Sequence, residues 1–258
     1  MKKFIIKNRK DQNIVVLFEK QEKQRGLVFV MHGLGGFKEQ PHIEAFAQAF
    51  KEKGYSAVRF DATNSFGESG GDYQDASVTN HLQDLEEIID WAKNQQWYQE
   101  PFCLIGHSLG AIAISLYTEN HPEKVKGLVP VSTLISGKLW LERHDKDLIE
   151  KWREEGTWNR GESFSKPGAI KIMKWNFVED IMRYDLLKNV QNLSMPVLLM
   201  VGDLDTGTPL INHQILFDVL PGTKELHVIK GADHNFKEEH HLEEIKATIK
   251  HWIERNNL

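Results

Sequence analysis

The segment from Gly106 to Gly110 has the residue types and spacing of a turn that presents a nucleophile. It reads Gly-His-Ser-Leu-Gly, so Ser108 stands between two glycines. An apolar run, Phe102–Ile105, precedes it, and a run rich in Ala, Ile and Leu follows, which predicts a strand-to-helix junction. A turn that sharp needs neighbours without a Cβ atom, and glycine meets that demand. The pattern predicts an exposed hydroxyl that attacks a carbonyl carbon.

A serine nucleophile needs a base to remove its proton and a carboxylate to orient that base. His234 is the histidine we favour as the base, because it follows the last predicted strand in a loop that Gly231 opens. Asp205 follows another predicted strand and is favoured as the acid, with Asp203 as the first alternative and Asp233 as the second. The resulting chain order, Ser then Asp then His, is the hydrolase order.

Attack on a carbonyl creates an oxyanion, which two backbone N–H groups must receive. Leu109 follows the serine at the start of a predicted helix, whose dipole favours negative charge, and is one expected donor. The segment from His32 to Gly36 follows another strand, and its glycines let the backbone approach a substrate closely. Leu34 in this segment is the second expected donor, and His32 is expected to be a structural hydrogen-bonding residue.

Length and composition are those of an ordinary globular chain. The 258 residues are 40% hydrophobic and 27% charged, with a net charge of −5. Nothing in the charge pattern indicates nucleic-acid binding, and no apolar run reaches the length of a membrane span. The N-terminal apolar run is too short for a signal peptide, and the single cysteine, Cys103, excludes a disulfide framework. We therefore expect a cytoplasmic location.

Strands and helices alternate along most of the chain. Strands are predicted at residues 4–6, 13–19, 26–31, 55–60, 102–105, 125–131, 197–201 and 226–229. Helical patterns are predicted at residues 41–54, 78–92, 112–117 and 242–253. This alternation argues for an α/β fold, a parallel sheet with helices on both faces, in which reactive groups gather at the carboxyl ends of strands. The candidates named above all follow such ends.

The stretch from Leu134 to Leu193 interrupts this alternation. It contains no clean strand, it is dense in charge, and it carries four of the tryptophans, Trp140, Trp152, Trp158 and Trp175. We predict a small helical cap at residues 134–193, lying over the end of a core formed by residues 1–133 and 194–258. The tryptophans would shape an apolar substrate pocket. The alternative is a surface excursion that they merely hold in place.

Five segments together resemble the α/β-hydrolase superfamily. They are His32–Gly36, Phe60–Asp61 with Phe66–Ser69, Gly106–Gly110, Gly202–Pro209 and Gly231–His234. Within the superfamily the chain most resembles small bacterial carboxylesterases, including the cinnamoyl (feruloyl) esterase-like group. The resemblance implies a mostly parallel eight-stranded sheet, no cofactor and no metal. It also implies a cap between the sixth strand and the acid-bearing strand, which matches residues 134–193.

The chain departs from that esterase group in two places. After Phe60–Asp61 the group usually carries Arg or Asn followed by Gly-His-Gly-x-Ser, whereas residues 62–69 read Ala-Thr-Asn-Ser-Phe-Gly-Glu-Ser here. Several of those esterases also have a polar residue where Leu109 stands. Because the altered loop borders the expected site, the aromatic-acid specificity of the group is not carried over.

The residues predict a serine esterase that cleaves small or medium carboxylic esters through an acyl-enzyme, with Ser108, His234 and Asp205 as its triad. The same machinery would serve a thioesterase or an amide hydrolase. An aminopeptidase would also need an acidic anchor for the substrate amine, for which the candidates are Glu142, Asp145 and Glu179. A non-catalytic member that binds a small molecule is a further alternative, as is a partner-binding module that uses the charged cap. The expected partner is a small ester, with neither nucleic acid nor membrane, and the chain is expected to be a monomer or a homodimer.

Overall fold

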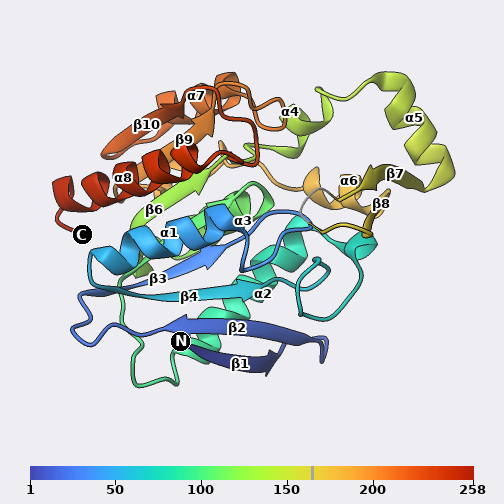
Figure 1. The fold of residues 1–258 in the computed structure, drawn as a ribbon. Helices are drawn as coiled ribbons and strands as arrows, with labels where there is room; N and C mark the ends of the chain where they lie inside the picture. The colour runs from blue at the N-terminus through green and yellow to red at the C-terminus, as the bar shows by residue number, and fades with distance from the viewer. Residues whose placement is uncertain (164–165) are drawn as a thin grey trace.

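A central sheet of eight strands organises the chain (Figure 1). This computed structural model describes residues 1–163 and 166–258, so residues 164 and 165 of the predicted cap lie outside the described part. The strands lie in the order β1-β2-β4-β3-β5-β6-β9-β10. Their bounds are Lys2–Lys7 (β1), Asn13–Glu19 (β2), Gly26–Met31 (β3), Tyr55–Asp61 (β4), Phe102–His107 (β5), Val125–Val131 (β6), Val197–Gly202 (β9) and Lys224–Ile229 (β10).

Most of this sheet is parallel. The strand β2 is antiparallel to both of its neighbours, and every pair from β4 to β10 is parallel. The expected mostly parallel eight-stranded sheet is therefore confirmed. Parallel strands place their carboxyl ends at the same edge of a sheet, so the loops that follow β3, β5, β9 and β10 meet there.

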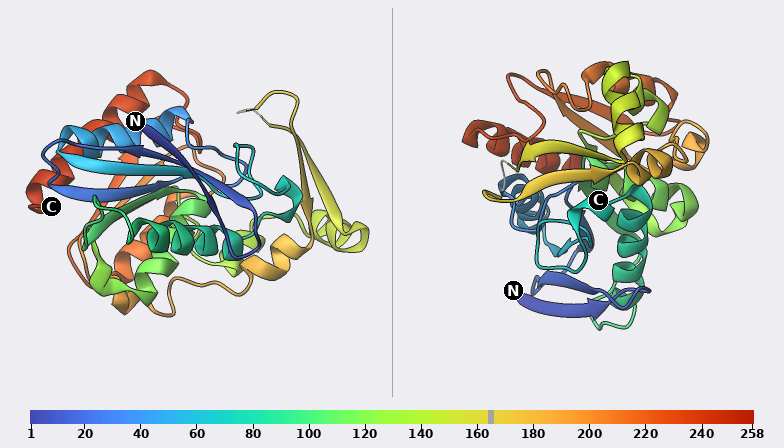
Figure 2. Two further views of the ribbon diagram at one scale, coloured as in Figure 1. Left: turned by 90° about the horizontal axis from the view of Figure 1, so that it is seen from below. Right: turned by 90° about the vertical axis from the view of Figure 1, so that its right-hand side faces the viewer.

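Helices cover both faces of the sheet (Figure 2). On one face lie α1 (Pro41–Glu52) and α8 (Glu239–Arg255), and on the other lie α2 (Val78–Ala92), α3 (Leu109–Asn120) and α7 (Leu210–Val219). Short 3-10 turns stand at Tyr73–Asp75 (η1), Pro122–Lys124 (η2) and Val190–Asn192 (η3). Each face has its own apolar core because successive side chains of a strand point to opposite sides.

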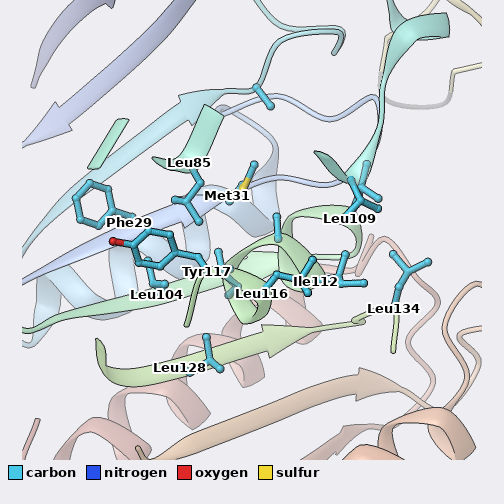
Figure 3. Close-up of a cluster of buried hydrophobic side chains, with 14 of the residues drawn as sticks. Phe29, Met31, Leu85, Leu104, Leu109, Ile112, Leu116, Tyr117, Leu128 and Leu134 are labelled. Atoms are coloured by element: carbon cyan, nitrogen blue, oxygen red, sulfur yellow. The ribbon is translucent and has the colours of Figure 1, made fainter. Parts of the chain in front are cut away.

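The larger core lies between the sheet and the helices α2 and α3. Along β3, Phe29 and Met31 point into this core, whereas Val28 and Val30 point toward α1 and α8. The helix α3 is buried along almost its whole length, as expected for the central helix behind a nucleophile turn. Figure 3 shows how its side chains meet those of the strands, among them Phe29, Met31, Leu104, Leu109, Ile112, Leu116 and Leu128.

The segment between β6 and β9 contains strands that the sequence analysis did not expect. It holds α4 (Gly137–Leu141), α5 (Lys146–Glu155), β7 (Thr157–Glu162), β8 (Ile170–Lys174) and α6 (Asn176–Ile181), and β7 pairs with β8 in an antiparallel hairpin. The hairpin was missed because β7 reads Thr-Trp-Asn-Arg-Gly-Glu and is exposed at five of its six positions, so it carries no apolar alternation. Its residues lie within the predicted cap, and we keep the name cap for residues 134–193.

The tryptophans of the cap form an aromatic cluster around Trp152. This side chain is 1% exposed, and its Nε1–H donates to the carbonyl oxygen of Met173 over 3.0 Å. The ring centroids of Trp158, Trp175 and Trp140 lie 5.1, 5.6 and 6.4 Å from that of Trp152. The cluster fastens α5 to the hairpin, and Trp152 belongs to the same continuous apolar core as α2 and α3.

Several polar contacts hold the cap to the core. The carboxylate of Asp180 in α6 accepts from both the backbone N–H and the hydroxyl of Thr79 in α2. Lys174 of β8 pairs with Asp75 over 2.6 Å. Lys166 donates to the carbonyl oxygen of Phe66 over 2.5 Å, which connects the cap to the loop that departs from the esterase pattern.

Among the described helices, none is long and apolar enough to cross a membrane.

A buried ion pair fixes that departing loop. The side chains of Lys38 and Asp61 are both fully buried, and Lys38 Nζ lies 2.6 Å from Asp61 Oδ2. The same carboxylate accepts from the backbone N–H groups of Lys38 and Glu68, each over 2.8 Å. Burial alone would lower the pKa of Lys38, but hydrogen bonds to Asp61, Glu68 and Glu39 outweigh it and raise the pKa to about 12. The pair ties the loop after β3 to the loop after β4.

Replacing Lys38 by methionine leaves Asp61 as an unpaired buried charge. We expect the Lys38→Met protein to lose about 3–5 kcal/mol of unfolding free energy in urea titrations, the usual cost of breaking a buried pair. The control is Lys93→Met, whose partner Asp90 lies 2.6 Å away on the exposed surface of α2, and it should lose less than about 1 kcal/mol. Equal losses in the two variants would contradict a special contribution from the buried pair.

Candidate active site

Ser108 stands at a strained turn between β5 and α3. Its φ of 54° and ψ of −115° are unusual for a residue with a side chain. A Cβ atom on Gly106 would lie 2.7 Å from the carbonyl oxygen of Gly110, and one on Gly110 would lie 2.3 Å from that of His32. The two glycines of the motif are therefore required by the close approach of backbone to backbone.

Three side chains from distant parts of the chain form a continuous hydrogen-bonded line. His234 Nε2 lies 2.9 Å from Ser108 Oγ, and His234 Nδ1 lies 2.8 Å from Asp205 Oδ2. They follow the carboxyl ends of β5, β9 and β10, where the sequence analysis expected them. This geometry lets the imidazole take the proton of the hydroxyl while the carboxylate holds the opposite ring nitrogen.

The carboxylate of Asp205 is fully buried and well supplied with donors. It accepts from the backbone N–H and from the hydroxyl of Thr208, each over 2.8 Å, besides the bond to His234. Burial by itself would raise the pKa of Asp205, but the hydrogen bond and charge of His234 and the two bonds from Thr208 hold it well below its usual value. Because an ionised carboxylate only accepts, Nδ1 of His234 carries the hydrogen and Nε2 is free to act as the base.

The alternative acids hold turns together. Asp203 accepts from the backbone N–H of Gly231 over 2.6 Å. Asp233 accepts from the backbone N–H of Asn235 over 2.9 Å and pairs with Lys237 at 2.9 Å. Both contacts shape the loop that carries His234, which is the usual work of short carboxylates in turns.

Leu34 and Leu109, whose backbone N–H groups are the expected oxyanion donors, line the same cavity as Ser108. Within the described chain, neither of these N–H groups donates to another protein group. The loop before Leu34 passes against the nucleophile, because a Cβ atom on Gly33 would lie 2.9 Å from Ser108 Cβ. His32 fixes this loop by donating from Nδ1 to the carbonyl oxygen of Gly33 over 2.8 Å and accepting at Nε2 from the backbone N–H of Ala62 over 2.9 Å. These contacts agree with the structural hydrogen-bonding role that the sequence analysis expected for His32.

His107, the residue before the nucleophile, is a supporting residue that the sequence analysis missed. Its Nε2–H donates to the backbone carbonyl oxygen of His234 over 2.8 Å, and the two rings lie 4.8 Å apart. On its other side the ring of His42 lies 4.5 Å away. Burial, and then the neighbouring His42 and His234, lower the pKa of His107 well below its usual value. A neutral imidazole therefore supports the loop of His234, and its only sequence signal was its place in the Gly-His-Ser-Leu-Gly motif.

A cavity of about 240 Å³ opens above Ser108 and His234, between the core and the cap. Of the four tryptophans that we expected to shape it, Trp140 lines the cavity. Trp152, Trp158 and Trp175 are not among its described lining residues, and this part of the expectation differs from the structure. The reason is that these three rings pack on one another, with Trp152 at the centre of the cluster.

Other side chains line the cavity where those three tryptophans were expected. Phe66 and Tyr73 line the cavity from the core and stack with ring centroids 4.6 Å apart. Arg160 and Lys171 line it from the β7–β8 hairpin. The sequence analysis missed both cations because it missed the hairpin that presents them.

The acidic residues considered as anchors for a substrate amine lie elsewhere. Glu142, Asp145 and Glu179 are exposed, and Asp145 caps α5 by accepting from the backbone N–H of Leu148 over 3.1 Å. No aspartate or glutamate occurs among the described residues that line the cavity. In residues 1–163 and 166–258, no group of three or more His, Cys, Asp or Glu side chains could hold a metal ion.

Comparisons with known proteins relate this chain to hydrolases. The model of the Hydrolase_4 family, described as "Serine aminopeptidase, S33", matches residues 22–160. A bovine protein, the mitochondrial palmitoyl-protein thioesterase ABHD10, is 25% identical over 240 residues, which cover 90% of this chain and 74% of that protein.

Solved structures share the fold over nearly the whole chain. Mouse alpha/beta hydrolase domain-containing protein 10 superposes with a TM-score of 0.81 at 20% identity, covering 99% of both chains. Est1E from Butyrivibrio proteoclasticus with bound ferulic acid superposes with a TM-score of 0.78 at 20% identity, covering 98% of both chains. These likenesses confirm the expected α/β-hydrolase fold.

The buried histidine next to His107 should make the protein sensitive to acid. Burial, and then the nearby His234 and His32, lower the pKa of His42 to about 3. The unfolded chain therefore binds a proton at this residue below about pH 6.5 that the folded chain does not bind, and stability falls as the pH falls from there. We expect His42→Phe to make the pH dependence of the unfolding free energy shallower between pH 6.5 and 4, by about 1 kcal/mol per pH unit.

The measurement is a series of urea titrations across that pH range. His251→Phe, which replaces an exposed histidine of α8, is the control and should keep the wild-type slope. A wild-type slope in His42→Phe would show that His42 does not carry this part of the acid sensitivity.

Proposed function

Because this chain belongs to the Hydrolase_4 family of serine hydrolases and has the α/β-hydrolase fold, we propose that it hydrolyses carboxylic esters of small or medium size through an acyl-enzyme. The observation that carries the proposal is the line of hydrogen bonds from Asp205 through His234 to Ser108 at a cavity. This is the arrangement in which a serine hydroxyl becomes a nucleophile at neutral pH. The substrate is a small molecule.

In the first half of the reaction Ser108 is acylated. Its Oγ attacks the carbonyl carbon while His234 Nε2 takes the proton, and Asp205 stabilises the imidazolium that forms. The negative oxygen of the tetrahedral intermediate is received by the backbone N–H groups of Leu34 and Leu109. The intermediate then expels the alkoxide, which takes the proton from His234, and the alcohol leaves.

In the second half, water replaces the alcohol. His234 removes a proton from the water as its oxygen attacks the acyl carbon, and the same two N–H groups receive the oxyanion. Collapse of this intermediate returns the proton to Ser108 Oγ and releases the carboxylic acid. His107 positions the base in both halves, because it holds the backbone carbonyl of His234.

Thioesters are a second candidate substrate class. The same residues would act on them, because a thiolate is expelled more readily than an alkoxide. Support comes from the bovine relative named as a palmitoyl-protein thioesterase, which is 25% identical to this chain.

Aminopeptidase activity, which the family description mentions, has less support. A free amino terminus is a cation, so a site for it needs a carboxylate. The described lining of the cavity has no such group and instead contains Arg160 and Lys171, which would repel the substrate.

Replacing the nucleophile tests the proposal directly. We expect Ser108→Ala to lower the turnover of 4-nitrophenyl butyrate about 10³-fold or more, while the melting temperature stays near that of the wild type. A fluorophosphonate probe should label the wild type at Ser108, as located by mass spectrometry. The control is Ser115→Ala, a helix serine bonded to the carbonyl of Ala111, which should keep both turnover and labelling. Full turnover by Ser108→Ala, or labelling at another residue, would contradict the mechanism.

The two neighbouring aspartates should differ strongly in their effect on rate. Asp205→Asn removes the charge that orients His234, and we expect kcat to fall by about 10³-fold or more. Asp203→Asn changes only a turn contact and should lower kcat less than about tenfold. The measurement is the steady-state rate with 4-nitrophenyl butyrate, and a larger loss in Asp203→Asn would assign the acid to that residue instead.

A further inference from the structure

Two cations of the cap face the cavity from neighbouring strands. Arg160 lies on β7 and Lys171 on β8, and both line the cavity that contains Ser108 and His234. The ladder pairs Asn159 with Ile172 and Glu162 with Ile170, with an irregularity between them. Arg160 and Lys171 therefore lie opposite one another at that irregularity, and the hairpin presents two positive charges together.

Nothing among the described side chains neutralises these two charges. The ion pairs of the described residues include neither of them, whereas Lys138, Lys151 and Lys174 of the cap lie 3.8, 3.8 and 2.6 Å from carboxylates. The guanidinium of Arg160 lies over the ring of Trp158, with Cζ 5.0 Å from the ring centroid, and Nη1 contacts the sulfur of Met173. Burial, and then the charge of Arg160, lower the pKa of Lys171.

Two unneutralised cations side by side repel each other, and this cost is relieved when an anion binds between them. The cation–π contact with Trp158 and the contact with Met173 hold the side chain of Arg160 in place and leave its charge without a carboxylate partner, so the fork of N–H donors is oriented before a ligand arrives. Carboxylate and phosphate oxygens are the groups that Arg and Lys bind best. A cavity that has two cations and, in its described lining, no carboxylate therefore favours an anionic substrate.

We propose that Arg160 and Lys171 form a subsite that binds an anionic oxygen group, a carboxylate or a phosphate, on the substrate of this hydrolase. The inference rests on the proposed function, because it specifies that the ester substrate carries an anionic group away from the carbonyl that Ser108 attacks. The subsite makes the cap a specificity element, because it selects an ester by its charge while the core supplies the chemistry.

Matched substrates test the subsite. We compare 4-acetoxybenzoate and 4-acetoxyphenyl phosphate with the neutral methyl 4-acetoxybenzoate, which share the acetyl ester and differ in the charge of the remote group. We expect kcat/KM of the wild type to be about tenfold higher for at least one anion than for the neutral ester, and this preference should shrink as salt is added. The two anions separate a carboxylate source from a phosphate source. Equal or lower kcat/KM for both anions at low salt would overturn the proposal.

Variants assign the preference to the two cations. In Arg160→Gln/Lys171→Gln, the ratio of kcat/KM for the preferred anion to that for the neutral ester should fall about tenfold. The control is Lys151→Gln, which removes one exposed charge from α5 and should leave this ratio unchanged. A wild-type ratio in the double variant would place the anion elsewhere and overturn the proposal.

A binding measurement separates this proposal from the proposed function. Ligand-observed NMR titrations on the Ser108→Ala protein compare benzoate and phenyl phosphate with benzamide, so that no turnover is needed. We expect at least one anion to bind about tenfold more tightly than benzamide, and this difference should disappear when Arg160 and Lys171 are also replaced by glutamine. If no ester is hydrolysed, the proposed function fails while this comparison still decides the subsite. If all three ligands bind equally, the subsite is wrong even when esters are cleaved.

Discussion

The close approach of three backbone segments around Ser108 is the constraint on which the rest of the structure depends. The loop after β3, the end of β5 and the first turn of α3 meet there at distances that only glycine allows at residues 33, 106 and 110. Holding Ser108 at a positive φ costs about 1–3 kcal/mol. A hydrogen bond from its backbone N–H to the carbonyl of Val131, at 2.9 Å, and the deep burial of α3 offset that cost. The packing of the sheet and its helices keeps this turn in its strained conformation.

Buried neutral imidazoles connect the loops around Ser108 to one another. His32 bridges the loop after β3 and the loop after β4, and His107 bridges the nucleophile turn and the loop after β10. An imidazole suits this position because one nitrogen donates while the other accepts, and burial keeps both rings uncharged. The site residues are thus placed by two layers of contacts, glycine packing and histidine bridges, before any substrate arrives.

The sequence predicted the core of this protein well and its cap poorly, for one physical reason. Residues such as Gly106, Ser108 and His234 stand where backbone strain or chemistry admits few residue types, so their spacing identifies them. The core strands are continuous apolar runs because both of their faces are buried. Strand β7 has neither property, since its pairing with β8 depends on backbone hydrogen bonds and five of its six residues are exposed. Arg160 was missed with it, and Trp152 was assigned to the substrate when it packs on other tryptophans. Contacts between side chains that pack on one another within the cap can be predicted only when the pairing of β7 with β8 is known.

The way in which the cap joins the core has a consequence for how this protein can change. The cap leaves from the end of β6 and returns to β9, its neighbour in the sheet, and a bridge between Ser136 and Asp185 closes its base. Within it, the ring of Trp152 packs against those of Trp158 and Trp175. An insertion whose two ends lie next to each other can be exchanged for another without changing the order of the strands beneath it. Evolution, or a protein engineer, could therefore replace the cap above the same Ser108 and His234 and obtain an enzyme that accepts different substrates.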